Sequence, residues 1–285
     1  MKIISGINEI ISMYEYYIID QWGVMHNGSQ GYSDAIECVD YLKKNNKKLI
    51  IISNSSKRSK SSFDNLPILG FKKESFLDFI TSGEMIWQTI LKSLDIYGKN
   101  LKKCFHIFDQ SKEDGIRFRD GLKNIEFVDN ILKSDFILAC TPFENSKPID
   151  YAYLLNCALE KNIIMFCANP DFETIEKGNN KNIFCIGTIA ELYKNMGGKV
   201  VIQGKPSQEI YDEVMKKRKV DKSKIIAIGD SLFHDISGAI NFGIDSILIT
   251  SGIHSNHFSK NLNWENTDLL KYNINPSYIC SKFMI

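Results

Sequence analysis

Two aspartates, five positions apart, form the pattern best suited to chemistry in this sequence. They lie in the segment Ile-Gly-Asp-Ser-Leu-Phe-His-Asp, in which Asp230 follows an apolar run and Asp235 falls in the loop or helix start that comes next. Mg²⁺ binds oxygen ligands and usually takes only one or two carboxylates from the protein. An acidic first turn of a helix would use the same residue types. Gly229 before the pair and Gly238 after it add a spacing that helix capping does not require, so the segment predicts a metal site.

Three other polar residues follow apolar runs in the same way. Asp20 could act as a carboxylate nucleophile, which forms an acyl phosphate that water later hydrolyses. Ser53, with the backbone amides of a following helix, could bind a phosphate, and Lys205 could neutralise its charge. Each has an ordinary alternative: Asp20 and Ser53 as caps of a turn or helix, and Lys205 as a solvated surface residue. Pro206 is expected in the first turn of a helix.

The apolar runs that precede these residues predict the fold. Helix-length amphipathic stretches separate the runs, a rhythm typical of parallel strands covered by helices on both faces. The expected strands are Tyr16–Asp20, Leu49–Ser53, Phe136–Cys140, Ile163–Ala168, Val200–Gln203, Ile225–Ile228 and Ser246–Thr250. The sequence therefore predicts an α/β protein with a Rossmann-like parallel sheet. In such a sheet the carboxyl ends of the strands share one edge, where ligands bind.

The stretch between Ser53 and Lys205 is too long for one crossover helix and carries strand–helix units of its own. A separate α/β unit inserted into the core is the simplest explanation. We expect a core of residues 1–80 and 200–285 and an inserted unit of residues 81–199, placed over the strand ends so that it shields the site from water.

The order of these motifs resembles that of the haloacid dehalogenase-like hydrolase superfamily, whose four motifs are strand–Asp, strand–Ser/Thr, Lys and strand–Gly-Asp-x-x-x-x-Asp. Other segments resemble its subclass IIA, which includes NagD-like, 4-nitrophenyl phosphatase-like and phosphoglycolate phosphatase-like proteins. These segments are Trp22-Gly23-Val24, Ser53-Asn54-Ser55-Ser56, Ala168-Asn169-Pro170-Asp171 and Gly204-Lys205-Pro206. The resemblance covers nearly the whole chain, and it places a large α/β cap between the second and third motifs.

The resemblance implies a phosphatase that uses Mg²⁺ as cofactor and acts on a small phosphorylated metabolite through an aspartyl-phosphate on Asp20. Ser53 and Asn54 would bind the phosphoryl group, and Lys205 would balance its charge. The implied metal ligands are Asp20, the backbone carbonyl of Trp22, Asp230 and, through the metal's waters, Asp235.

One position departs from the family's pattern. Phosphatases of the family carry a second Asp two residues after the nucleophile, which acts as general acid and base, and this chain has Trp22 there. The indole N–H is a donor only and exchanges no proton near neutral pH. His26 could replace the missing group, since its ordinary pKa is about 6.5, although a turn or surface histidine is the simpler interpretation. Asp171 is a candidate specificity residue of the cap, or alternatively an ordinary loop aspartate.

The composition narrows the partners. Lys and Arg (35) nearly cancel Asp and Glu (34), so no bulk field attracts nucleic acid or an anionic membrane. No apolar run is long enough to span a bilayer. The first residues show no secretory signal pattern. The seven cysteines contain no C-x-x-C pair, and both observations favour a reducing cytoplasmic setting. The resemblance also implies that the chain can form a homodimer.

Two other functions remain open from the sequence. A phospholigand-binding pseudoenzyme would keep the pocket and lack turnover, as Trp22 suggests. A haloacid dehalogenase would also use an aspartate nucleophile, but it needs no metal, and Asp230 and Asp235 argue against it.

Overall fold

The computed structural model describes residues 1–98, 100–175, 182–216, 218–255, 258 and 271–285. The chain divides into two compact units. The first consists of Met1–Ser53, Lys60–Ile80 and Lys205–Ile285, and the second of Asn54–Ser59 and Thr81–Gly204. The segments 54–59 and 200–204, which the sequence analysis assigned to the core, therefore lie in the second unit.

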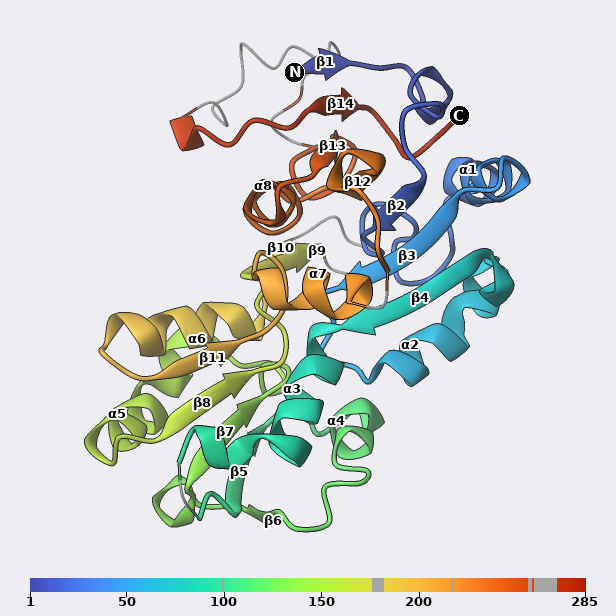
Figure 1. Cartoon of the computed structure of the whole chain (residues 1–285). Helices are drawn as coiled ribbons and strands as arrows, with labels where there is room; N and C mark the ends of the chain where they lie inside the picture. Colours follow the sequence, from blue (N-terminus) through green and yellow to red (C-terminus); the bar gives the residue numbers. More distant parts are fainter. Residues whose placement is uncertain (99, 176–181, 217, 256–257, 259–270) are drawn as a thin grey trace. The chain divides into compact units, whose positions relative to one another are not determined.

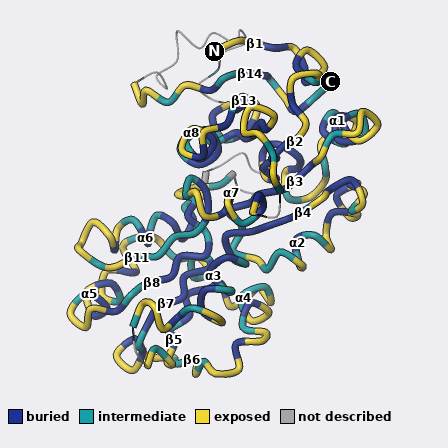
Figure 2. Tube along the Cα trace, in the orientation of Figure 1, coloured by how far each residue is buried: buried dark blue, intermediate teal, exposed yellow. Residues whose placement is uncertain are grey.

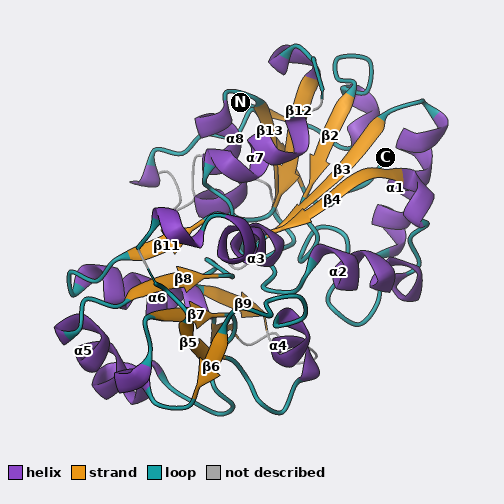
Figure 3. Ribbon diagram, turned by 60° about the horizontal axis from the view of Figure 1, so that its bottom comes forward, coloured by secondary structure: helices purple, strands orange, loops and turns teal. Residues whose placement is uncertain are grey.

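The described part of the first unit is built on a seven-stranded sheet of order β1-β14-β13-β12-β2-β3-β4 (Figure 1). The pairs from β1 to β3 are all parallel. The strands are β1 (Lys2–Ile3), β2 (Tyr16–Ile19), β3 (Lys48–Ser53), β4 (Phe76–Thr81), β12 (Ile225–Gly229), β13 (Asp245–Ile249) and β14 (Tyr278–Cys280). Figure 3 shows β12, β2, β3 and β4 side by side.

Helices cover both faces of this sheet because alternate strand residues are apolar on each side. Ile247 and Ile249 pack in the same cluster as Cys38 and Leu42 of α1, whereas Leu248 packs on the opposite side. The helices are α1 (Ser33–Lys44), α2 (Ser59–Asn65), α7 (Gln208–Met215) and α8 (Ser237–Phe242). Short helical turns are η1 (Ile7–Glu9), η2 (Leu66–Leu69), η3 (Lys73–Ser75), η7 (Lys222–Lys224) and the π-helical η8 (Leu232–Ile236).

The second unit has its own parallel sheet of order β11-β8-β7-β5-β6 within the residues described. The strands are β5 (Lys103–Ile107), β6 (Glu126–Val128), β7 (Phe136–Ala139), β8 (Ile164–Cys167) and β11 (Val200–Ile202), and an antiparallel pair is formed by β9 (Glu173–Ile175) and β10 (Asn182–Phe184). The helices are α3 (Ser82–Lys92), α4 (Glu113–Phe118), α5 (Ala152–Glu160) and α6 (Ile186–Asn195), with turns η4 (Leu94–Ile96), η5 (Ile131–Lys133) and η6 (Pro148–Tyr151).

Two hydrophobic clusters, one on each face of this sheet, form the core of the second unit. Leu138 and Phe166 pack with Ile86 of α3, and Met165 packs with Leu155 of α5 on the other face. The inner strands of both sheets are buried along most of their length (Figure 2), whereas the edge strands β1, β6 and β11 are exposed or half-buried. The predicted α/β class with parallel sheets is confirmed.

Two expectations about Lys205 and its neighbours are wrong. The strand before Lys205, β11, pairs with β8 in the sheet of the second unit, and not in the sheet that carries Asp20. Pro206 lies in a turn, and α7 begins only at Gln208 with Ser207 as its N-cap. Periodicity identified β11 correctly as a strand, but an apolar run carries no information about which of two parallel sheets it joins.

Candidate active site

Asp20 and Asp230 follow two neighbouring parallel strands, β2 and β12. The register pairs Ile19 with Ile228, so both chains leave the sheet at the same edge. The backbone N–H of Asp20 continues the ladder and donates to the carbonyl of Ile228 at 2.9 Å. Residues far apart in sequence therefore meet because parallel strands present their carboxyl ends together.

Asp235 joins these two residues from η8. One ligand atom from each of Asp20, Asp230 and Asp235 lies within 4.8 Å of the others. The π-helical turn is capped by Ser231, and the Asp235 carboxylate accepts from the Ser231 N–H at 3.1 Å. A Cβ on Gly229 would lie 2.0 Å from the Asp235 side chain, so only glycine allows this approach.

Lys205 is the cation of this acidic cluster. Its Nζ lies 2.5 Å from Oδ1 of Asp20 and 2.6 Å from Oδ1 of Asp235, and all three side chains are at least nine-tenths buried. Burial alone would lower the pKa of Lys205, but the charges of Asp20 and Asp235 outweigh it and raise the pKa above its usual value. The ammonium is therefore permanently charged and fixes one oxygen of each carboxylate.

Asp230 lies in the same cluster, where the charge of Lys205 favours its ionised form but is outweighed. Burial and the charges of Asp20 and Asp235 raise its pKa well above the usual range. The N–H of Ile253 donates to Asp230 Oδ2 at 2.8 Å. A Cβ on Gly23 (φ +78°) would lie 2.0 Å from this same oxygen, so the turn after β2 is closely packed on it.

The donor set fits a hard divalent cation. Three carboxylates meet one ammonium, so the fully ionised cluster keeps two negative charges, and oxygen atoms are the ligands that Mg²⁺ prefers. The residues that could hold such an ion are Asp20, Asp230 and Asp235. The raised pKa of Asp230 reflects first its burial and then the charges of Asp20 and Asp235, which a bound cation would offset.

Ser53 and Asn54 stand at the boundary between the units. Ser53 is the last residue of β3, which pairs with β2, the strand that precedes Asp20. Its buried side chain therefore lies at the same edge of the sheet as Asp20. Asn54 begins the second unit, where its amide donates to Asp171 Oδ1 at 2.8 Å. The structure thus brings the two predicted residues Asn54 and Asp171 together.

Trp22 and His26 pack against each other in the loop after Asp20. Their rings lie 5.6 Å apart, edge to face, and the indole covers Gly28, whose added Cβ would lie 2.1 Å from it. Trp22 is 37% exposed, whereas His26 is buried and accepts from the Gly28 N–H through Nδ1 at 3.1 Å. His26 is thus a component of the turn.

Sequence reasoning missed the segment Gly252–His254. The Ile253 N–H contacts Asp230, a Cβ on Gly252 would lie 2.0 Å from Asp230 Oδ2, and His254 Nε2 accepts from the Leu232 N–H at 3.2 Å. The run Ser246–Thr250 followed by Ser-Gly was the available signal, because it is another strand end with a glycine turn. Periodicity recognised that strand without drawing attention to its end.

Comparison with known proteins identifies the family. The family described as haloacid dehalogenase-like hydrolase matches residues 17–117, and the one described as HAD-hydrolase-like matches residues 202–284. These matches contain the Asp20 and Ser53 motifs and the Lys205, Asp230 and Asp235 motifs, respectively. The chain belongs to the haloacid dehalogenase-like hydrolases, as its motif order predicted.

Individual relatives agree with this assignment. The 5'-nucleotidase YutF of Bacillus subtilis is 25% identical over 84% of this chain and 88% of its own, and phosphoglycolate phosphatase 1A of Arabidopsis thaliana is 22% identical over 88% and 73%. The crystal structure of a haloacid dehalogenase-like hydrolase from Brucella suis superimposes with a TM-score of 0.82 at 25% identity, over 99% of this chain and all of that one.

No helix in the described ranges is long and apolar enough to cross a membrane.

Proposed function

We propose that this hydrolase is a Mg²⁺-dependent phosphatase that acts on a small phosphorylated metabolite. The observation that carries the proposal is the buried ammonium of Lys205, held between Asp20 and Asp235 beside Asp230. A structural ion pair would need one carboxylate. Three carboxylates at one sheet edge form a site for a cation and an anion together.

In the proposed reaction, a carboxylate oxygen of Asp20 attacks the phosphorus atom of the substrate. The P–O bond to the leaving group breaks, and its electron pair stays on the leaving oxygen. Water then attacks the phosphorus of the aspartyl-phosphate, which regenerates the carboxylate and releases inorganic phosphate. Ser53 would donate to a phosphoryl oxygen, and Lys205 would both orient Asp20 and neutralise phosphoryl charge. Bound Mg²⁺ would supply further charge neutralisation at the three carboxylates.

The second unit would act as the cap that shields the aspartyl-phosphate and contacts the leaving group. Its chain position between the Ser53 and Lys205 motifs supports this role, and its core is independent of the core of the first unit. The seven cysteines are buried and unpaired, which is compatible with a reducing compartment such as the cytoplasm.

A panel of phosphate esters tests the proposal directly. Nucleoside 5'-monophosphates, phosphoglycolate and 4-nitrophenyl phosphate are incubated with Mg²⁺ and the wild-type protein or Asp20→Asn. We expect Mg²⁺-dependent phosphate release by the wild type and none by the variant, because an amide cannot form the acyl phosphate. Equal rates for the two proteins on every ester would refute the proposal.

A non-catalytic phospholigand-binding protein is the second candidate, and Trp22 is the observation that favours it. Its indole occupies the position of the family's acid and base and is partly exposed. Mg²⁺-dependent binding of inorganic phosphate, with no turnover by either the wild type or Trp22→Asp, would support this candidate. Turnover by Trp22→Asp alone would instead show that the rest of the site is competent.

A further inference from the structure

The loop that follows Ser53 is fastened to the second unit at both of its ends. Residues 54–59 continue directly from β3 of the first unit, but they pack against the second unit and belong to it. The proposed phosphate-binding residue Ser53 is therefore covalently joined to a loop held by the inserted unit.

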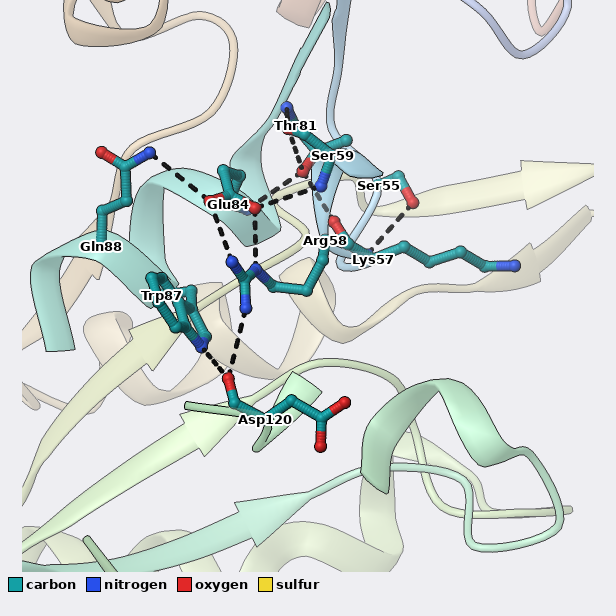
Figure 4. A network of polar contacts seen from close by, with 9 residues as sticks. All are labelled: Ser55, Lys57, Arg58, Ser59, Thr81, Glu84, Trp87, Gln88 and Asp120. Carbon is teal, nitrogen blue, oxygen red and sulfur yellow. Dashed lines mark hydrogen bonds and ion pairs between the residues drawn. The ribbon is translucent and has the colours of Figure 1, made fainter. Parts of the chain in front are cut away.

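Arg58 fastens the far end of the loop (Figure 4). Its guanidinium donates to both carboxylate oxygens of Glu84, through Nε at 2.7 Å and Nη2 at 3.1 Å, and stacks 3.5 Å from the ring centroid of Trp87. The N–H of Ser59 donates to the same carboxylate at 3.2 Å. Glu84 and Trp87 both lie on α3, and the guanidinium also donates through Nη1 to the Asp120 carbonyl at 3.4 Å.

The ion pair is partly shielded from water, because the Arg58 side chain is 23% exposed and that of Glu84 is 14% exposed. Burial would raise the pKa of Glu84, but its hydrogen bonds and charge interaction with Arg58 lower the pKa below the usual value. A bidentate, stacked guanidinium has few alternative geometries, so it constrains the loop more than an exposed ion pair does.

Backbone contacts hold the middle of the loop on the N-terminus of α3. Thr81, the N-cap, donates its hydroxyl to the Lys57 carbonyl at 2.6 Å. The N–H of Gly83 donates to the Ser55 carbonyl at 3.0 Å, and a Cβ on Gly83 would lie 2.1 Å from the Ser56 oxygen. The loop thus follows the helix end at a separation that only glycine permits.

Asn54 fastens the near end. Its side-chain amide donates to Asp171 at 2.8 Å, and its carbonyl accepts from the Ser82 hydroxyl at 2.9 Å. The carbonyl of Ala168 also lies within hydrogen-bond distance of the Ser82 hydroxyl, so the two carbonyls share its single hydrogen. Asn54 is consequently tied to α3 and to the loop that contains Asp171.

We propose that Arg58, Glu84 and Asp171 are positioning residues for phosphate binding, which set the conformation of the chain immediately after Ser53. This inference rests on the proposed function of Ser53 and Asn54. It assigns Asp171 to holding Asn54, and it gives Arg58 and Glu84 a role through the peptide that they anchor. Without the Arg58–Glu84 contact or the Asn54–Asp171 contact, the loop can adopt other conformations. Ser53 and the N–H groups that follow it would then no longer be positioned to bind the phosphoryl oxygens.

The test compares Arg58→Ala, Arg58→Lys and Asp171→Ala with wild type, because alanine at position 171 removes the oxygen that accepts from Asn54. It measures KM and kcat for 4-nitrophenyl phosphate and the Kd of inorganic phosphate with Mg²⁺ by calorimetry. We expect KM and Kd to rise on the order of tenfold to a hundredfold, with a smaller change in kcat, because misplacement of a binding group costs about this much. Lysine keeps the charge but neither the bidentate bond nor the stacking, so Arg58→Lys should rescue little.

Arg117→Ala is the matched control. Arg117 also pairs with a glutamate in the second unit, Glu113, but the pair lies on α4 and is largely exposed. We expect its kinetics to equal those of wild type. If Arg58→Ala destabilises the fold, Asp171→Ala, which removes the acceptor of the Asn54 amide at a partly exposed position, still decides the question.

The outcomes separate this inference from the proposed function. Folded variants with wild-type KM and Kd, beside an active wild type, would overturn the positioning role alone. A wild-type protein that neither hydrolyses phosphate esters nor binds phosphate would overturn both.

Discussion

Asp230 shows how a single residue can reveal the charge state for which a site is built. It shares the cluster with Asp20 and Asp235, both of which contact Lys205, and it is buried. Its negative charge is therefore unfavourable unless a cation is present. If the proposed metal binds here, we expect the stability of the protein to depend on it independently of any catalytic activity.

We expect Asp230→Asn to raise the thermal midpoint of the protein without divalent cations and to abolish stabilisation by Mg²⁺. For the wild type, Mg²⁺ at a hundred times its Kd adds about 2.7 kcal/mol to the free energy of unfolding, or a few degrees in midpoint. Differential scanning fluorimetry with and without chelator measures both shifts. Asp212→Asn, an exposed aspartate of α7, is the control and should keep the wild-type response. An unchanged Mg²⁺ response in Asp230→Asn would contradict the proposed ligand set.

Trp22 leads to a prediction about which substrates can react. Without a positioned acid, the leaving oxygen must depart as an anion, so the rate should fall steeply as the pKa of the leaving group rises. We expect nitrophenyl phosphates to be hydrolysed much faster than alkyl phosphates. Trp22→Asp should flatten this dependence and accelerate alkyl esters by about 10²-fold or more. The measurement is kcat/KM across a series of aryl and alkyl phosphates.

A flat dependence in the wild type would show that another group delivers the proton. His26→Asn would then identify whether His26 is that group, since its imidazole contacts the Trp22 ring.

The residue types of the site could be read from the sequence because each follows an apolar run. Asp20 and Asp230 directly follow β2 and β12, and Ser53 ends the adjacent strand β3 of the same sheet, as expected. The contacts of Arg58 could not be read in this way. Arg58 and Glu84 are 26 residues apart, and no local period relates a loop residue to the first turn of a later helix.

At the scale of elements, the sheets explain which expectations were sound and which were not. Continuous apolar runs identified the buried strands β2, β3, β7, β8, β12 and β13. The edge strands β1 and β6 have two and three residues, too few for any periodic signal. The strand β5, which lies between β7 and the edge strand β6, was missed because polar residues interrupt it, among them His106, which the fold buries.

His106 gives the second unit a dependence on pH. Burial, and secondarily the charge of Arg119, lower its pKa from 6.5 to about 3. Its Nδ1 lies 3.2 Å from Nε of Arg119, from which it accepts, and its Nε2 lies 3.3 Å from Sγ of Cys140. Protonation would place a second positive charge beside the guanidinium, in a site closed to water.

The direction of this pH dependence follows from the linkage between proton binding and folding. Between pH 6.5 and about 3 the unfolded chain binds a proton at His106 that the folded chain does not, so the free energy of unfolding falls as pH falls through this window. We expect wild type to lose up to about 1.4 kcal/mol per pH unit relative to His106→Gln, which does not titrate. Urea unfolding at pH 4 to 8 measures the difference. It should be constant above pH 7, and a difference that stays constant down to pH 4 would contradict the buried neutral imidazole.

At the scale of the whole molecule, the second unit begins and ends at neighbouring points, as expected for a segment inserted into another domain. A Cβ on Gly204 would lie 2.7 Å from the side chain of Ser82, so the chain leaves this unit beside the point where it enters. An inserted segment whose two ends lie close together disturbs the sheet of the host domain little. The length between motifs indicated an inserted unit from the sequence, but its exact limits depend on packing such as that of the loop 54–59.

We expect residues 81–204 produced alone to fold, because they contain a five-stranded parallel sheet and a hydrophobic cluster on each of its faces. The complementary protein, with Ile80 joined to Lys205 by a short Gly–Ser linker, should fold as well and keep Asp20, Asp230 and Asp235 together. Mg²⁺ should raise the thermal midpoint of the linked protein, because all three carboxylates belong to the first unit. It should leave the midpoint of the isolated residues 81–204 unchanged. Circular dichroism and thermal unfolding of both proteins measure this. Cooperative unfolding of each, with the Mg²⁺ response in only one, would establish that the metal site needs nothing from the inserted unit. Loss of the response in the linked protein would instead assign part of the site's stability to residues 81–204.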